Sequence, residues 1–69
     1  MEKTMKIEGM MCPHCEARVK KILEDMVQVT EAWVSHVEGY AIVKLAEEVE
    51  DEVLRKTIED QGYKVLSVQ

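Results

Sequence analysis

The sequence is poor in aromatic residues: it has no phenylalanine, and its only aromatic side chains are Trp33, Tyr40 and Tyr63. A hydrophobic core is therefore expected to be aliphatic, built from Val, Ile, Leu and Met. With 69 residues, the chain is near the lower size at which such a core stabilises a fold without disulfides or bound metal. We expect a single domain over residues 1–69, with room for one site.

Long hydrophobic runs are also absent. Residues 1–6 contain no apolar stretch as long as that of a signal peptide, and no later segment approaches the roughly 20 apolar residues of a membrane span. This predicts a cytoplasmic protein that meets a membrane only through a partner. In that reducing compartment, two cysteines separated by two residues are more often metal ligands or a redox pair than a structural disulfide.

Basic charge is scarce, with nine Lys and Arg against 14 Asp and Glu and a net charge of −5. Binding to a phosphate backbone needs several basic side chains together, so nucleic acid is not an expected partner. Residues 27–69 carry most of the imbalance, with four basic and nine acidic side chains. The acidic run at 47–52 is interpreted as a solvated helix start, or as a surface that steers docking to a basic partner.

The spacing of apolar residues predicts alternating strands and helices. Alternation indicates strands, and repeats of three and four residues indicate helices, with a turn at Glu38-Gly39. The predicted elements are a strand at 4–8, a helix at 13–26, strands at 29–37 and 40–45, a helix at 51–61 and a strand at 63–68. This βαββαβ order fits an α+β, ferredoxin-like sandwich, with two helices on one face of a four-stranded antiparallel sheet.

The two central strands place apolar groups on both faces of that sheet. If Val29, Ala32 and Val34 face the helices, then Trp33 points to the uncovered face together with Ile42 of the next strand. This apolar pair is interpreted either as an incidental surface feature or as a contact patch for a partner or a second copy.

The chemistry of the chain is concentrated in Cys12 and Cys15, which straddle the predicted start of the first helix. Two thiolates at this spacing can turn toward one point and share a soft ion such as Cu(I), whereas a structural zinc site normally has four protein ligands. The possible nitrogen ligands are His14 and His36. Since His36 is predicted on a strand 21 residues after Cys15, we expect a site with low coordination.

The surroundings of the cysteines favour the thiolate form. The unpaired N–H groups at a helix N-terminus lower thiol pKa values. Arg18 and Lys21, one turn along, are interpreted as solvated charges on the helix face, and the alternative is that they lower the thiol pKa or offset the negative charge of a bis-thiolate site. We interpret His14 as an exposed modulator of the site, with direct ligation as the alternative.

The segment Gly9-Met10-Met11-Cys12-Pro13-His14-Cys15, after a first strand and opening a first helix, resembles the heavy-metal-associated domain family, which includes bacterial copper chaperones. The resemblance continues through the Gly39 turn to the closing segment at 59–63. It implies a ferredoxin-like fold, Cu(I) bound by Cys12 and Cys15, and no enzymatic activity. It also implies delivery of Cu(I) to a copper-transporting P-type ATPase or a copper-responsive repressor.

The same resemblance implies supporting roles for two further residues. Met10 packs under the metal loop without being a ligand, and Tyr63 lies beside the site and shields the metal. One departure is Gln28, where many members have a glycine, and this residue is expected to reshape the turn after the first helix while leaving the fold intact.

Several alternatives remain open at this stage. Cys-Pro-His-Cys is also the active-site sequence of oxidising thioredoxin-fold proteins, in which Cys12 would attack and Cys15 would resolve. A thioredoxin fold places a cis-proline opposite the cysteines, whereas the only proline here is Pro13, inside the motif. The chain also fits an excised N-terminal domain of a heavy-metal P-type ATPase. Ag(I), Hg(II), Zn(II) and Cd(II) are alternative ions. We expect a monomer without metal, with a metal-bridged dimer as the alternative when loaded.

Overall fold

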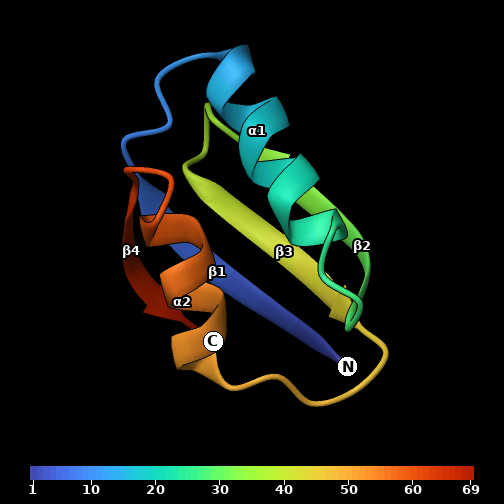
Figure 1. The fold of residues 1–69 in the computed structure, drawn as a ribbon. Helices are drawn as coiled ribbons and strands as arrows, with labels where there is room; N and C mark the ends of the chain where they lie inside the picture. The colour runs from blue at the N-terminus through green and yellow to red at the C-terminus, as the bar shows by residue number, and fades with distance from the viewer.

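Six secondary-structure elements follow one another in the predicted order in a computed structural model that describes all 69 residues (Figure 1). They are β1 (Glu2–Glu8), α1 (Pro13–Glu24), β2 (Val29–Ser35), β3 (Tyr40–Leu45), α2 (Asp51–Glu59) and β4 (Lys64–Val68). The strands form one antiparallel sheet in the order β2-β3-β1-β4, and both helices lie on the same face of it. The predicted ferredoxin-like fold is confirmed.

The core lies between the helices and the sheet, and its 14 buried residues are all hydrophobic. Met5 and Ile7 enter it from β1, where they alternate with exposed neighbours as the sequence pattern predicts. No aromatic side chain is among the buried residues, so the expectation of an aliphatic core is confirmed. α1 contributes Val19 and Leu23, and α2 contributes Leu54 and Ile58.

The hairpin between β2 and β3 differs from the prediction at one end. β2 stops at Ser35 rather than at residue 37, because Ser35 closes a turn over residues 36–39. Its carbonyl accepts the N–H of Gly39 at 2.9 Å, and its hydroxyl accepts the N–H of Glu38 at 3.1 Å. Gly39 has a φ of +73°, a conformation that other residues rarely adopt. The prediction that placed His36 on a strand is therefore wrong.

A bulge in β2 explains how its inward-facing residues break the strict alternation. Val29 pairs with Leu45 and Glu31 with Lys44, so one strand has an extra residue at this point. The extra residue lets both Val29 and Ala32 face the core although they are three positions apart.

The uncovered sheet face carries the predicted apolar pair. Trp33 and Ile42 lie opposite each other in the β2–β3 register, and Trp33 is 56% exposed. Gln28, in the turn before β2, has no positive φ, and its carbonyl accepts the N–H of Ala46 at 2.8 Å. The turn therefore forms with ordinary backbone angles and does not require a glycine.

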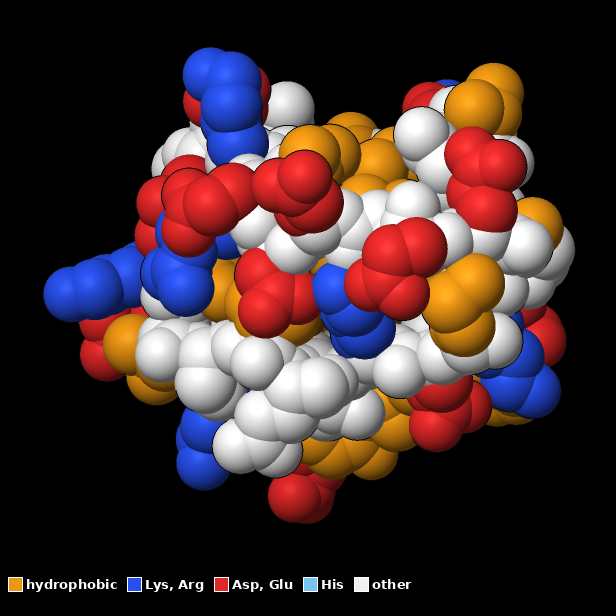
Figure 2. Space-filling model, turned by 90° about the horizontal axis from the view of Figure 1, so that it is seen from below, with side chains coloured by type: hydrophobic (Ala, Val, Ile, Leu, Met, Phe, Trp, Pro, Cys, Tyr) orange, Lys and Arg blue, Asp and Glu red, His pale blue; other side chains and the backbone are white.

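The acidic segment lies at the end of the molecule opposite the cysteine loop. The β3–α2 connection runs across the lower end in Figure 1, and Figure 2, seen from that end, shows acidic side chains gathered on it. Lys3 from β1 pairs there with Asp51 at 2.7 Å and with Glu48 at 3.5 Å. None of the helices combines the length and the apolar character needed to cross a membrane.

Candidate metal centre

A short loop connects β1 to α1 and carries the first cysteine. It starts at Gly9, whose φ of +105° is readily adopted only by glycine, and a Cβ there would lie 3.6 Å from Cδ1 of Tyr63. Met10 follows and is only 5% exposed, with its side chain in the hydrophobic core. The positive φ of Gly9 and the buried side chain of Met10 fix the path of the loop toward the helix.

The cysteines are brought together by the start of α1. Cys12 is the N-cap residue in an extended conformation, and Pro13 follows it at the first helical position, where its missing N–H costs no hydrogen bond. The carbonyl of Cys12 accepts the N–H groups of Cys15 at 3.1 Å and of Glu16 at 3.2 Å. Both thiols consequently lie at one helix end, and both are half-buried.

The two sulfur atoms are 3.7 Å apart. This is far longer than a disulfide bond of about 2.05 Å, so both thiols are free. Two metal–thiolate bonds of about 2.3 Å each can span up to about 4.6 Å, so the sulfurs can share one ion without moving apart. The geometry fits a soft ion bound by two thiolates at a positive helix end.

Hydrogen bonds hold the pKa of Cys15 below its usual value of 9.0, at about 7. The first cause is a hydrogen bond from the hydroxyl of Tyr63, followed by the backbone N–H of Met11 and the thiol of Cys12. The same contact raises the pKa of Tyr63, because its bond to the sulfur stabilises the protonated hydroxyl.

The charges that the sequence offered as an alternative cause of this shift play a lesser part. Neither Arg18 nor Lys21 is among the main causes of the lowered pKa of Cys15. Lys21 instead pairs with Asp25 along the helix at 3.3 Å. Hydrogen bonds, rather than these two charges, therefore account for the lowered pKa of Cys15, and the interpretation of Arg18 and Lys21 as helix-face charges stands.

The other predicted site residues take different positions. Tyr63 lies against Cys15, whereas Met10 is in the core and His14 is exposed. No group of three or more His, Cys, Asp or Glu side chains is arranged to hold a metal ion. Within one chain, the thiols of Cys12 and Cys15 are therefore the donors that the fold brings together.

One contact near the site was not foreseen from the sequence. Glu16, in the first turn of α1, accepts the backbone N–H of His36 at 2.9 Å and lies 2.8 Å from its Nδ1. The backbone bond is the first cause of the lowered pKa of Glu16, and the imidazole is the second. No sequence signal indicates this pairing, because it depends on β2 ending at Ser35 and the turn folding back toward α1.

Comparison with known proteins places residues 4–64 within the heavy-metal-associated domain as a family model describes it. A copper chaperone CopZ from Staphylococcus epidermidis (strain RP62A) is 35% identical over 65 residues, which cover 93% of this chain and 96% of the relative. The solved structure of a CopZ metallochaperone is 33% identical, with a TM-score of 0.89 over 96% of this chain and 100% of that chain.

Two further solved structures are similar over nearly the whole chain. A copper-binding domain from HMA7, a P-type ATPase, is 27% identical, with a TM-score of 0.85 and coverage of 100% of this chain and 99% of that one. The N-terminal domain of Tn501 mercuric reductase, solved as its Hg(II) complex, is 34% identical, with a TM-score of 0.80 and coverage of 90% of each chain.

Proposed function

This chain belongs to the heavy-metal-associated domain family, and on that premise we propose that it is a copper chaperone that holds one Cu(I) between Cys12 and Cys15. The observation that carries the proposal is the pair of free sulfurs, 3.7 Å apart at the N-terminus of α1. Thiolates favour Cu(I), and its low coordination suits a site with two donors. The copper is cargo, and no substrate bond is made or broken, so the chain acts as a carrier and not as an enzyme.

The open site supports transfer by ligand exchange. A thiolate of the receiving protein binds the exposed ion first, giving an intermediate with three thiolates, and one cysteine of this chain then leaves. A second thiolate of the receiving protein replaces the remaining cysteine in the same way, so the ion is transferred without being released into water. Both thiols are partly exposed and only two donors hold the ion, so an incoming thiolate can reach it.

The receiving protein in this proposal is a copper-transporting P-type ATPase or a copper-responsive regulator. Similarity to a copper-binding domain of a P-type ATPase supports the first, since two like domains can exchange an ion between equivalent cysteine pairs. The proposed location is the cytoplasm, where a reducing environment keeps the thiols free.

Three neighbours of the cysteines receive supporting roles in the proposal. Met10 anchors the loop through its buried side chain and does not bind the ion. Tyr63 donates a hydrogen bond to Cys15 and shields one side of the site. His14 lies between the two ligands in sequence and is exposed, and it does not form a three-residue metal-binding group with them. We assign it the role of an exposed modulator.

Competitive titration with Cu(I) and Zn(II) tests the choice of metal. We expect one Cu(I) per chain, bound more tightly than Zn(II), and loss of this binding in the Cys12→Ser/Cys15→Ser double variant. His14→Ala serves as the matched control in the same loop and should retain Cu(I) binding. Tighter binding of Zn(II) than of Cu(I) would overturn the copper assignment.

The thiol–disulfide oxidoreductase alternative has one observation in its favour, the pKa of Cys15 near 7, a value found in redox-active cysteines. Turnover of insulin disulfides by the metal-free protein would support it. The carrier proposal expects no turnover above that of a small-molecule dithiol. The similarity to a mercuric reductase domain leaves Hg(II) as the alternative ion. The length of the source gene decides whether this is a free-standing protein or a domain of an ATPase.

A further inference from the structure

The sheet has two edges, formed by β2 on one side and β4 on the other. An edge strand presents unpaired N–H and C=O groups, which can pair with a strand from another chain. What covers these groups therefore decides whether the protein stays monomeric.

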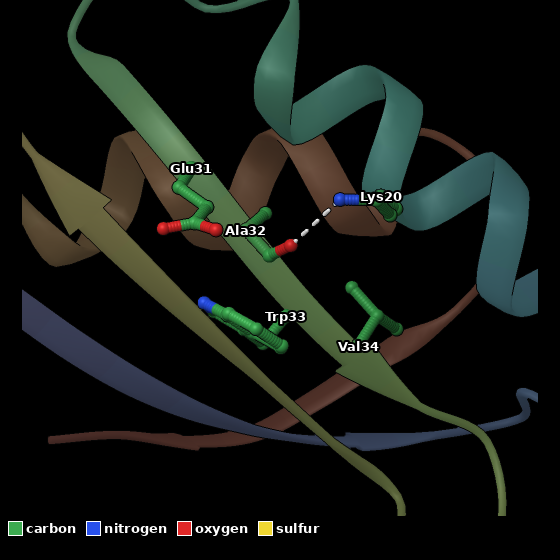
Figure 3. A pocket seen from close by; sticks show the side chains of 5 residues that line it. All are labelled: Lys20, Glu31, Ala32, Trp33 and Val34. Carbon is green, nitrogen blue, oxygen red and sulfur yellow. Dashed lines mark hydrogen bonds between the residues drawn. The ribbon is translucent and has the colours of Figure 1, made fainter.

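Along the β2 edge, polar side chains from α1 take the place of a neighbouring strand. Nζ of Lys20 donates to the carbonyl of Ala32 at 3.0 Å, and Oε2 of Glu24 accepts the N–H of the same residue at 3.2 Å. Figure 3 shows Lys20 reaching from the helix to this carbonyl. Lys20 and Glu24 are also bonded to each other at 2.7 Å, so the pair is held in place over the strand.

The β4 edge carries a similar arrangement, made by α2, in which Arg55 is paired with Glu52 at 3.2 Å rather than with Glu59. Nη1 of Arg55 donates to the carbonyl of Val65 at 3.0 Å, and Oε2 of Glu59 accepts the N–H of Val65 at 3.1 Å. On both helices a basic residue and an acidic residue four positions later hold the two backbone groups of one buried edge residue. The same kind of side-chain contact thus occurs at both edges of the sheet, which suggests that the two contacts have the same role.

We propose that the pairs Lys20–Glu24 and Arg55–Glu59, here called the edge guards, keep a second copy of this chain from adding its strand to either edge of the sheet. Each guard occupies the N–H and the C=O that an incoming strand would have to use. This goes beyond the carrier function and does not depend on metal.

The backbone groups of β2 that the α1 guard does not cover show where pairing with another strand would begin. In an antiparallel ladder alternate residues face the edge, so the N–H and C=O of Val34 lie on the same side as those of Ala32. No side chain hydrogen-bonds to them. Next to Val34 lies an open pocket of about 260 Å³, bordered also by Lys20 and Trp33. Trp33 is largely exposed there and is the only tryptophan of the chain.

A second copy is the partner that fits this edge. Strand β2 of another copy presents the same free groups, and two such strands can pair antiparallel about a twofold axis, each one meeting the other's Val34. The added strand would then lie beside the side chain of Trp33 on the uncovered face and that of Val34 on the helix face. Removing the guard should therefore yield a symmetric dimer, or longer assemblies if β4 is opened as well.

The test compares two double variants of α1 by sedimentation of the metal-free, reduced protein. Lys20→Ala/Glu24→Ala removes the guard. Lys21→Ala/Asp25→Ala removes an ion pair of the same type and spacing that touches no strand. We expect the guard variant to reach twice the monomer mass at concentrations at which the wild type and the control remain monomeric. A monomeric guard variant, or a control that associates equally, overturns the proposal.

The α2 guard has its own matched control. Arg55→Ala/Glu59→Ala is compared with Lys56→Ala/Asp60→Ala, whose pair is 3.9 Å apart and exposed. The first variant should associate and the second should not. In the associated α1 variant, emission of Trp33 should shift to shorter wavelength and exchange of the Val34 amide should slow at least tenfold. Association without either change would place the contact elsewhere and refute the edge assignment.

Hydrogen exchange on the wild-type protein keeps the proposal testable if a guard variant does not fold. The guarded amides of Ala32 and Val65 should exchange at least tenfold more slowly than the unguarded amide of Val34 on the same edge. Equal exchange of Ala32 and Val34 would show that the guard is not in place in solution, and would overturn the inference.

Discussion

At the scale of single residues, the hydroxyl of Tyr63 contributes most to the lowered pKa of one of the two thiols. The hydroxyl of Tyr63 is the first cause of the low pKa of Cys15, so a residue far along the sequence adjusts a ligand that the first loop supplies. Gly9 is needed at the start of that loop for its backbone conformation, with a φ of +105°, since a Cβ there would make only ordinary van der Waals contact with the ring of Tyr63.

Replacing Tyr63 by phenylalanine should raise the pKa of Cys15. The ring keeps its packing, but the thiolate loses its hydrogen-bond donor, so the protonated form gains relative to the thiolate. The measurement is the pH dependence of alkylation of the metal-free protein. The midpoint near pH 7 in the wild type should move to higher pH in Tyr63→Phe, and the rate at pH 7 should fall.

Tyr40→Phe provides the control for this prediction, because Tyr40 is the only other tyrosine and lies on β3. Its alkylation profile should match that of the wild type. An unchanged midpoint in Tyr63→Phe would contradict the role assigned to the hydroxyl and return the explanation to the helix end and its charges.

The residues of the site were predictable in part. Cys12 and Cys15 stand out because their spacing at a helix start has a direct chemical meaning. The family resemblance placed Tyr63 beside the site, but its effect on the pKa of Cys15 was not predicted, because spacing along the chain directs attention to the nearby charges of Arg18 and Lys21. Sequence distance also misled the reading of His36, which the turn after β2 brings to Glu16.

At the scale of elements, α2 is held by few contacts. It is nine residues long, and only Leu54 and Ile58 are buried, so each carries a large share of its attachment to the sheet. Val53 also fits the apolar spacing of this helix in the sequence, but its side chain is 46% exposed. Apolar spacing thus located the helix correctly and made its buried face too wide.

Shortening Leu54 to alanine should lower the free energy of unfolding by about 2–5 kcal/mol, since it removes a fully buried side chain and leaves a cavity. Val53→Ala, one position earlier, should change it by no more than about 0.5 kcal/mol, because that side chain is half in solvent. Urea denaturation of both metal-free variants measures the difference. Similar losses for the two would mean that α2 packs with a different face toward the core.

The boundaries of elements were less predictable than their order. Periodicity gave the six elements, but β2 ends two residues earlier than its apolar pattern suggests, because the hydroxyl and carbonyl of Ser35 close a turn. The bulge after Val29 likewise follows from the register with β3. Such features depend on partners across the sheet, which a single strand's sequence does not contain.

At the scale of the whole molecule, charge and chemistry are separated. The cysteine loop lies at one end of the sheet, and the acidic segment before α2 lies at the other (Figures 1 and 2). Lys3 neutralises part of that acidic end, which supports the interpretation of a solvated helix start.

The fold as a whole was the most predictable level. A chain of this length with six alternating elements has few ways to bury two helix faces, and packing both against one sheet is the simplest. The pairing of α1 and α2 side chains with the sheet edges was beyond prediction, because the residues at Ala32 and Val65 reveal it only when strand order is known.

X-ray absorption of the protein loaded with one Cu(I) per chain identifies the atoms bound to the metal and so tests the proposed site. Each copper should have two sulfur ligands and no nitrogen ligand, and the His14→Ala variant should give the same spectrum. A copper–nitrogen contribution that disappears in His14→Ala would contradict the proposed site, as would copper that remains bound when Cys12 and Cys15 are both replaced by serine.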